Sequence, residues 1–258
     1  MLPTSAIDLE RALNDALRQV AITSDQCVRV VDRSYPDLEE IAVILESATL
    51  KSEAARPPVL ASNRERALIT RAFLIRGRKF SAGPANIDFV LAASDVVLAQ
   101  TRDEKGNVVL VLQSASSGKI EVVIARSNLE AAIAELARSE AGQHGVTIEK
   151  VKLDLVPHGS REVAAQVQFM ARKLFFTATI RIKAKLEIDE QMTACLSGLT
   201  CTGEGTIGTL ACGFLAPHLR KLDGRSFPLA ALPLGEIKFR DVRFDLADSV
   251  KVTAEFGA

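Results

Sequence analysis

The sequence has few aromatic side chains: its 258 residues include no tryptophan, one tyrosine and eleven phenylalanines. Because 48% of the residues are nevertheless hydrophobic, the interior must be built mostly from aliphatic side chains. Neither sign of charge is in excess, since 32 basic and 32 acidic residues cancel. This balance argues against a general nucleic-acid binder, which needs surplus cations to displace counterions. The hydrophobic fraction excludes intrinsic disorder, and the length allows one large domain or two small ones.

Long hydrophobic runs are also missing. The longest charge-free stretches, 191–203 and 205–218, are shorter than the ~18–20 apolar residues that a membrane-spanning helix needs. The first twenty residues carry five charges and therefore lack the apolar core of a secretory signal. We expect a cytoplasmic protein, or a mature form from which an export signal has been removed.

Cysteine is scarce, with only Cys27, Cys195, Cys201 and Cys212. Their spacing lacks the C-x2-C pairs of zinc sites, and a chain of this size does not need disulfides to hold its fold. A free cysteine behaves as a small hydrophobic residue, so the sequence favours buried thiols over disulfides and predicts no metal site.

The three histidines, His144, His158 and His218, belong to no recognisable catalytic set. The sequence has no G-x-S-x-G motif, no phosphate-binding loop and no dinucleotide fingerprint. We therefore expect no enzymatic activity and no cofactor.

Two segments predict amphipathic helices. Residues 5–19 begin with Ser5 as a candidate N-cap, and residues 127–141 begin with Ser127 or Asn128 in that role. At an offset of 120 residues the two segments share the pairs Leu9/Leu129, Glu10/Glu130, Ala12/Ala132 and Arg18/Arg138. Short helices resemble one another by chance, so this match is weak evidence for an internal repeat.

A second recurrence lies in two predicted strands. Gly145 is followed by VTIEKVKLDL and Gly235 by EIKFRDVRFDL, an offset of about 91 residues. In the first copy the apolar phase slips by one residue between Ile148 and Val151, which predicts a β-bulge because side chains alternate along a strand. The second copy slips in the same way.

The strongest strand signal is the unbroken alternation of residues 176–189. Fourteen residues at ~3.3 Å each span about 45 Å, and a strand of that length must twist and wrap around something. Further alternating sets lie at 163–169 and 250–256, and two more strands, 108–112 and 119–125, are predicted on either side of a serine-rich turn. The fold class is therefore α+β: a long, curved, bulged antiparallel sheet wrapped around amphipathic helices.

Residues 206–222 predict a third helix, which is apolar on nearly all sides. Such a helix is expected to be buried against other elements, with a kink at Pro217 and an end at Gly224. An extended, proline-punctuated link at 226–235 follows it.

The order of these elements resembles the LmeA-like bacterial proteins, which are similar in fold to the tubular lipid-binding superfamily. The resemblance rests on the S-x-L-x-x-A-[IL] helix at 127–133, on Gly145 with its bulged strand, and on the C-terminal segment 227–256. It implies a lipid-binding domain over residues 1–258, either single or made of two related halves at about 5–125 and 126–258.

An aliphatic groove between the curved sheet and the third helix is the expected binding site. Acyl chains gain about 0.8 kcal/mol per buried CH₂ and need length rather than aromatic stacking. The alternative for each lining residue is that it belongs only to the core. The candidate lining residues are Phe176, Ile180, Ile182, Leu186, Ile207, Leu210, Phe214 and Leu215.

A basic run at 64–79 has a net charge of +5, six cations less Glu65. It could contact an anionic lipid headgroup or membrane surface, with Arg71, Arg76, Arg78 and Lys79 as candidates. The alternative is a solvated strand face balanced by nearby acids.

The sequence thus predicts non-enzymatic binding or transfer of a lipid or another long apolar ligand. The alternative is a scaffold or interaction protein whose trough or sheet edge binds a partner protein.

Overall fold

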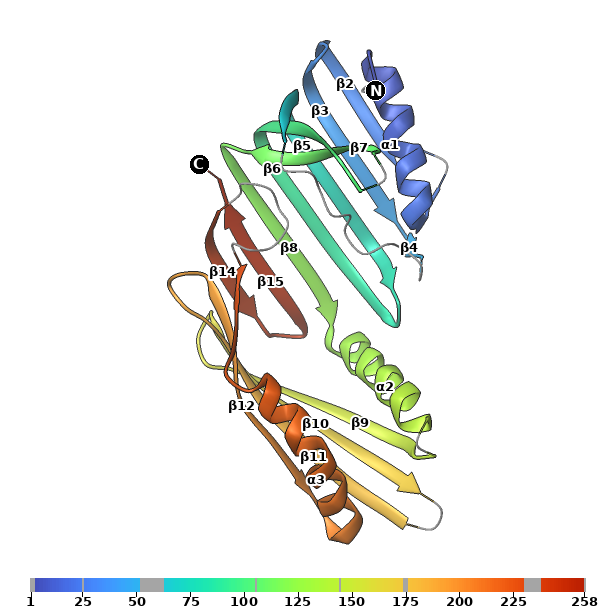
Figure 1. Cartoon of the computed structure of the whole chain (residues 1–258), viewed down its shortest axis with the longest axis vertical. Helices are drawn as coiled ribbons and strands as arrows, with labels where there is room; N and C mark the ends of the chain where they lie inside the picture. The colour runs from blue at the N-terminus through green and yellow to red at the C-terminus, as the bar shows by residue number, and fades with distance from the viewer. Residues whose placement is uncertain are drawn as a thin grey trace. The chain divides into compact units, whose positions relative to one another are not determined.

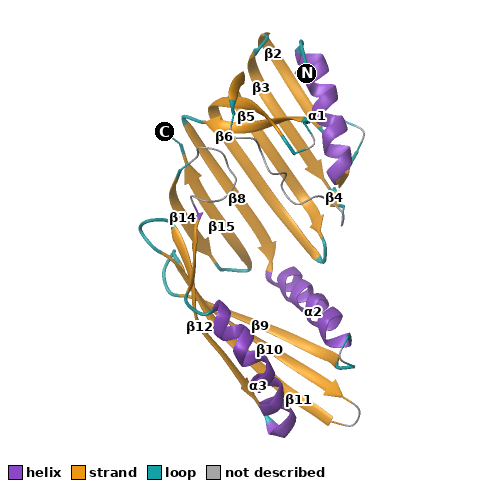
Figure 2. Ribbon diagram, in the orientation of Figure 1, coloured by secondary structure: helices purple, strands orange, loops and turns teal. Residues whose placement is uncertain are grey.

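The computed structural model describes residues 3–24, 26–51, 63–104, 106–143, 145–173, 176–229 and 238–257. In these residues the fold is α+β, with three helices and two open, mainly antiparallel sheets (Figure 1, Figure 2). The chain divides into two compact units. The first comprises Met1–Val123, Leu232–Asp241 and Thr253–Ala258, and the second comprises Ile124–Ala231 and Val242–Val252.

A ten-stranded sheet and one helix account for the first group of elements. The sheet order is β1-β4-β5-β6-β8-β15-β14, while β3 pairs with β5 and carries β2, and β7 pairs with β6. The elements are α1 (Ala6–Val20), β1 (Ala21–Ile22), β2 (Val28–Ser34), β3 (Asp37–Glu46), β4 (Thr49–Leu50), β5 (Glu65–Ala82), β6 (Ala85–Arg102), β7 (Val108–Ser114), β8 (Ser117–Ala125), β14 (Phe239–Asp245) and β15 (Ser249–Phe256). β8, β14 and β15 each also contribute residues to the second unit.

The two longest strands, β5 and β6, lie in a part of the chain for which no strand was predicted from alternation. Each has 18 residues, and they pair antiparallel along their length. β3 runs parallel to β5, with Ile41 opposite Phe73. The expectation of a purely antiparallel sheet is therefore wrong at this one edge, because a pairing between distant segments leaves no local sequence pattern.

The serine-rich turn between β7 and β8 does not reverse the chain. Both strands pair antiparallel with β6, β7 along 97–102 and β8 along 88–94, so residues 108–125 follow one edge of β6 with a kink between them. The kink is held by Ser116, whose Oγ donates to the carbonyl of Ser94 and to Oδ2 of Asp95, both at 3.0 Å. Asp95 has a positive φ of 48° at this point.

Helix α1 is built as the sequence predicts. Ser5 is its N-cap, and its Oγ accepts the N–H of Asp8 at 3.2 Å. The helix packs beside β2 (Figure 1), with Leu9 fully buried in a core that includes Ile41 and Phe256. The amphipathic stripe therefore positions α1 on the sheet.

The second unit contains a five-stranded sheet in the order β13-β12-β11-β10-β9, in which every neighbouring pair is antiparallel. Its elements are α2 (Arg126–Gly142), β9 (Thr147–Pro157), β10 (Glu162–Lys173), β11 (Phe176–Ile188), β12 (Thr193–Gly203), α3 (Gly205–Leu222) and β13 (Arg225–Pro228). The long strand and the third helix predicted from the sequence are thus both present. Among the described residues, no helix has the length and hydrophobicity to cross a membrane.

The predicted bulge is confirmed in β9. Met170 and Ala171 of β10 are adjacent, yet they pair with Lys150 and Ile148, so Glu149 is the extra residue. The predicted cap of α2 is wrong: the helix begins at Arg126 with Ala125 as N-cap, and no side chain bonds there. Gly235 of the second recurrence lies outside the described residues.

Both α1 and α2 are fastened to a strand by the same kind of bond. Oε2 of Glu10 accepts the backbone N–H of Val30 at 2.8 Å, and Oε2 of Glu130 accepts the backbone N–H of Leu153 at 2.9 Å. Each glutamate is the fifth residue of its helix, and the two are 120 residues apart. The helix match seen in the sequence therefore includes a residue with a shared structural role.

This bond predicts a stability effect in the second unit. Glu130→Ala leaves the N–H of Leu153, a residue that is almost fully buried, without its acceptor, which should lower the free energy of unfolding by about 1–3 kcal/mol. Glu135→Ala, on an exposed position of the same helix, is the control and should change it by less than about 0.5 kcal/mol. Urea unfolding measures both, and equal effects would contradict a role for the bond.

Candidate functional site

The central strands of the second unit carry one continuous apolar face. Residues that pair directly in an antiparallel sheet lie on the same side. Four apolar pairs follow one another along β10 and β11: Val163 with Leu186, Ala165 with Ala184, Val167 with Ile182, and Phe169 with Ile180. All eight side chains are half-buried except Val163, which is buried. We call these eight residues the apolar face.

The opposite side of the same strands is polar, and its Lys185 and Arg181 are paired with acids. Nζ of Lys185 lies 3.0 Å from Oε2 of Glu187 and 3.1 Å from Oε1 of Glu162. Hydrogen bonds to Glu187 and then Glu162 raise the pKa of Lys185. Nη1 of Arg181 lies 2.6 Å from Oε1 of Glu204. This side is therefore a solvated face with its own counter-charges.

Helix α2 covers the apolar face on the β9 side. Its Ala134 forms a buried cluster with Ile148, Val151 and Ala171, and Val167 and Phe169 pack against that cluster. Val167 and Phe169 belong to the apolar face, so α2 lies on the same side of the sheet. Three of the four helix residues at this cluster are alanines (Ala134, Ala137 and Ala141, beside Ile133), which lets the helix come close to β9.

Helix α3 covers the other flank, over β11 and β12 (Figure 2). Cys201 pairs in register with Ile182, so its side chain is on the apolar face, and it forms a disulfide with Cys212 of α3. One step further along, a Cβ on Gly203 would lie 2.1 Å from the carbonyl group of Gly208 in α3. Helix and strand backbones are therefore in direct contact.

The disulfide corrects the expectation of free thiols for two of the four cysteines. Cys201 and Cys212 are bonded, whereas Cys27 and Cys195 are free, the first buried and the second half-buried. The spacing of 11 residues carried no recognised motif, because the bond depends on a strand and the helix after it folding back on each other.

The predicted lining residues fall into two groups. Ile180, Ile182 and Leu186 are half-buried on the apolar face, and Leu215 is half-buried on the side of α3 that also carries Gly208 and Cys212. Ile207, at the start of α3, is half-buried as well.

The remaining three lining candidates are exposed. Leu210 and Phe214 are 59% and 80% exposed on the outer side of α3, and Phe176 is 60% exposed at the start of β11. The expectation that α3 is buried on several sides is thus wrong. Hydrophobicity alone predicted burial, but the sheet offers this helix one surface only.

The predicted headgroup residues are not gathered on one surface. Successive side chains of β5 point to opposite faces, so Arg71 shares a face with Phe73, while Arg76 and Arg78 lie on the other. Arg71 pairs with Glu39 at 3.2 Å and Arg76 with Glu46 at 3.6 Å, and both acids come from β3. Lys79 has a positive φ of 51° and its backbone N–H donates to Oδ1 of Asp88. Two of the six cations in the basic run are therefore paired with acids that lie about thirty residues away in the sequence.

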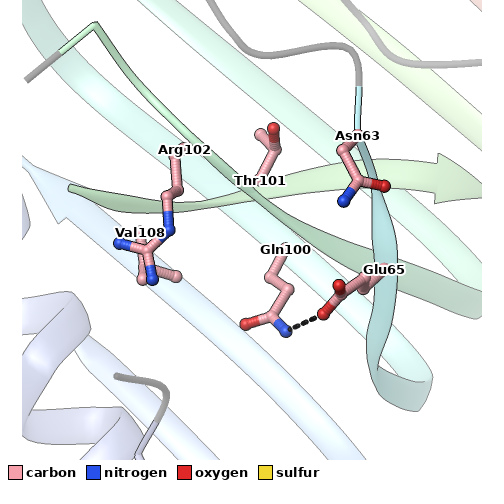
Figure 3. A pocket seen from close by; sticks show the side chains of 6 residues that line it. All are labelled: Asn63, Glu65, Gln100, Thr101, Arg102 and Val108. Carbon is pink, nitrogen blue, oxygen red and sulfur yellow. Dashed lines mark hydrogen bonds between the residues drawn. The ribbon is translucent and has the colours of Figure 1, made fainter. Parts of the chain in front are cut away.

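The first unit has surface depressions of its own. One of about 200 Å³ is lined by Asn63, Glu65, Gln100, Thr101, Arg102 and Val108 (Figure 3). Three of its polar side chains form hydrogen bonds within the chain: Gln100 Nε2 donates to Glu65 Oε2 at 2.8 Å, and Arg102 donates to the carbonyl of Gly106.

Across the described ranges, no group of three His, Cys, Asp or Glu side chains could hold a metal ion. His158 and His218 are exposed, and His144 lies outside the described residues.

Comparison with known proteins gives no identification: no family model, curated protein or solved structure matches the chain.

The contact between Gly203 and Gly208 predicts that a single methyl group loosens α3. Gly203→Ala should lower the free energy of unfolding by about 1–3 kcal/mol and reduce amide protection in α3, because one of the two backbones must move. Gly213→Ala, in the same helix with open space around it, is the control and should be neutral or stabilising by up to about 1 kcal/mol. Hydrogen exchange measures both, and unchanged α3 protection in Gly203→Ala would contradict the contact.

The cysteine assignment predicts a distinct alkylation pattern. In denaturant without reductant only Cys27 and Cys195 should be modified, and Cys201 and Cys212 should follow only after reduction, as read by peptide mass spectrometry. Removing the disulfide by a double Cys→Ser change at 201 and 212 should cost about 2–4 kcal/mol. Modification of all four cysteines without reductant would contradict the pairing.

Proposed function

We propose that the second unit binds the acyl chain of a lipid on the apolar face, between α2 and α3. The observation that carries the proposal is the set of four apolar pairs on β10 and β11, in which every side chain except Val163 stays half-buried although helices flank the pairs on both sides. A core that is closed by its own helices would bury such pairs fully. A long apolar ligand would complete their burial.

The chemistry of this surface suits an alkyl chain. Seven of its eight side chains are aliphatic and Phe169 is the exception, so stacking and hydrogen bonding contribute little. The pairs extend over six residue steps, roughly 20 Å of strand. Each CH₂ covered there contributes about 0.8 kcal/mol, so binding strength would grow with chain length.

The resemblance to the LmeA-like proteins leads to the same ligand class. Under this proposal the protein binds or transfers lipid without enzymatic activity, and the sheet has the curvature of the tubular lipid-binding superfamily. The disulfide also indicates the kind of cellular compartment in which the protein works. Because structural disulfides persist in oxidising surroundings, we infer that the protein works there, which favours the exported mature form over the cytoplasmic protein among the two expectations from its sequence.

The test is lipid uptake by matched variants. Wild-type protein should carry lipid detectable by native mass spectrometry and should take up a fluorescent long-chain fatty acid. Ile182→Glu should reduce uptake at least about tenfold, because a bound alkyl chain would remove water from an unpaired carboxylate on the apolar face. Lys183→Glu changes the next residue, which points to the opposite side and is exposed, and should keep uptake.

Ile182→Ala covers the case in which the glutamate variant fails to fold. It keeps an apolar side chain and should weaken uptake while the protein remains folded by circular dichroism. Wild-type protein that carries no lipid and takes up no fatty acid would overturn the proposal. A stoichiometric partner protein bound in place of lipid would favour the scaffold function instead.

A further inference from the structure

The outer side of α3 presents one continuous exposed stripe. Leu210, Phe214, Pro217 and Lys221 follow each other at spacings of four, three and four residues, which places them on the same side of an α-helix. All four are exposed, and Phe214 is the most exposed large apolar side chain described. We call these four residues the α3 stripe.

The charged side chains of α3 are all basic. Its sequence contains no acidic residue, and Arg220 and Lys221 stand in its last turn. Neither forms an ion pair with an acid in the described parts of the chain, whereas Arg71 and Arg76 of β5 and Arg181 and Lys185 of β11 do. Asp223, the nearest acidic residue in the sequence, accepts a hydrogen bond from the backbone N–H of Leu199. The stripe is thus apolar in its first half and cationic at its end.

The attachment of α3 keeps this side outward. The disulfide and the contact between Gly203 and Gly208 fix which side of the helix faces the sheet, so Phe214 cannot turn inward. At the beginning of the helix, the N–H of Glu204 donates to the carbonyl of Thr179 at 2.9 Å. This bond brings the start of α3 within three residues of the exposed Phe176 on β11.

We propose that the α3 stripe docks on an anionic lipid surface, with Leu210 and Phe214 inserted and Lys221 at the headgroups. An interfacial helix buries an apolar side and pairs its cations with anionic lipids, and a lysine stem reaches from the apolar layer to the headgroups. This inference rests on the proposed function, since docking would bring the apolar face of the same unit to the source of its lipid. A partner protein or a second copy of the chain would not require the cationic end.

The experiment is vesicle flotation of the full chain with phosphatidylcholine alone and with an equal mixture of phosphatidylcholine and phosphatidylglycerol. Wild-type protein should bind the mixed vesicles and should bind phosphatidylcholine several-fold more weakly. Phe214→Ser should reduce binding to mixed vesicles by about tenfold or more, and Leu210→Ser by a similar factor. Lys221→Glu should reduce it at least about fivefold, an effect that vanishes on phosphatidylcholine.

Matched controls separate the stripe from general stickiness. Leu136 on α2 is 60% exposed, almost the same as Leu210 at 59%, but it lies outside the α3 stripe, so Leu136→Ser should leave vesicle binding unchanged. Lys152→Glu on β9 changes an exposed lysine away from α3 and is the charge control. Uptake of monomeric fluorescent fatty acid should stay at the wild-type level in the stripe variants.

Several outcomes overturn the proposal. The first is that wild-type protein does not float with mixed vesicles, whether or not it takes up fatty acid. Equal losses in Leu210→Ser and Leu136→Ser overturn it as well. So does a Phe214→Ser variant that changes the native mass from dimer to monomer and leaves flotation intact, because the stripe would then be a protein interface. Absent fatty-acid uptake with intact, stripe-dependent flotation would instead sink the proposed function and leave the docking surface standing.

Discussion

Direct contact between two backbones decides how the second unit is arranged. Where Gly203 meets Gly208, no side chain separates strand β12 from helix α3, and the disulfide between Cys201 and Cys212 fixes the next turn of the helix. A helix held so closely can face the sheet in one orientation only. The small residues and the cysteine must point inward, and as a consequence Leu210 and Phe214 must point to solvent. The apolar character of α3 therefore does not translate into burial.

The same constraint shapes the apolar face. Helix α2 approaches β9 through small residues, and α3 approaches β12 through glycine and the disulfide, so both helices sit at the flanks of the sheet. The central pairs of β10 and β11 are left half-buried between them. The helices are thus fixed to the two flanks of the sheet by close packing and the disulfide. The central strands between them, β10 and β11, are covered less completely. A surface of that kind suits a ligand that is flexible and apolar.

The elements that the sequence predicts well are those with a local signature. Helix α1, strand β11 and the bulge at Glu149 follow from periodicity within a few neighbouring residues. The features it missed depend on segments far apart in the chain. Arg71 and Arg76 looked like a free basic patch because their partners Glu39 and Glu46 come from a strand that pairs in parallel, some thirty residues away. Composition could not reveal which cations are balanced.

The same distinction between local and long-range features applies to the candidate site. Alternation correctly puts Ile180, Ile182 and Leu186 on one side of β11, but no local pattern tells which side of α3 meets the sheet. That choice is made by the two cysteines and two glycines, whose importance appears only when strand and helix are seen together. Glu10 and Glu130 are a similar case. Their match is visible in the sequence at an offset of 120 residues, but only the structure shows that each accepts a hydrogen bond from a strand N–H group. The scarcity of aromatic residues bears on the same contacts. In the second unit, α2 and α3 are held against the sheet by alanine, glycine and a disulfide, while Phe214 of α3 is exposed.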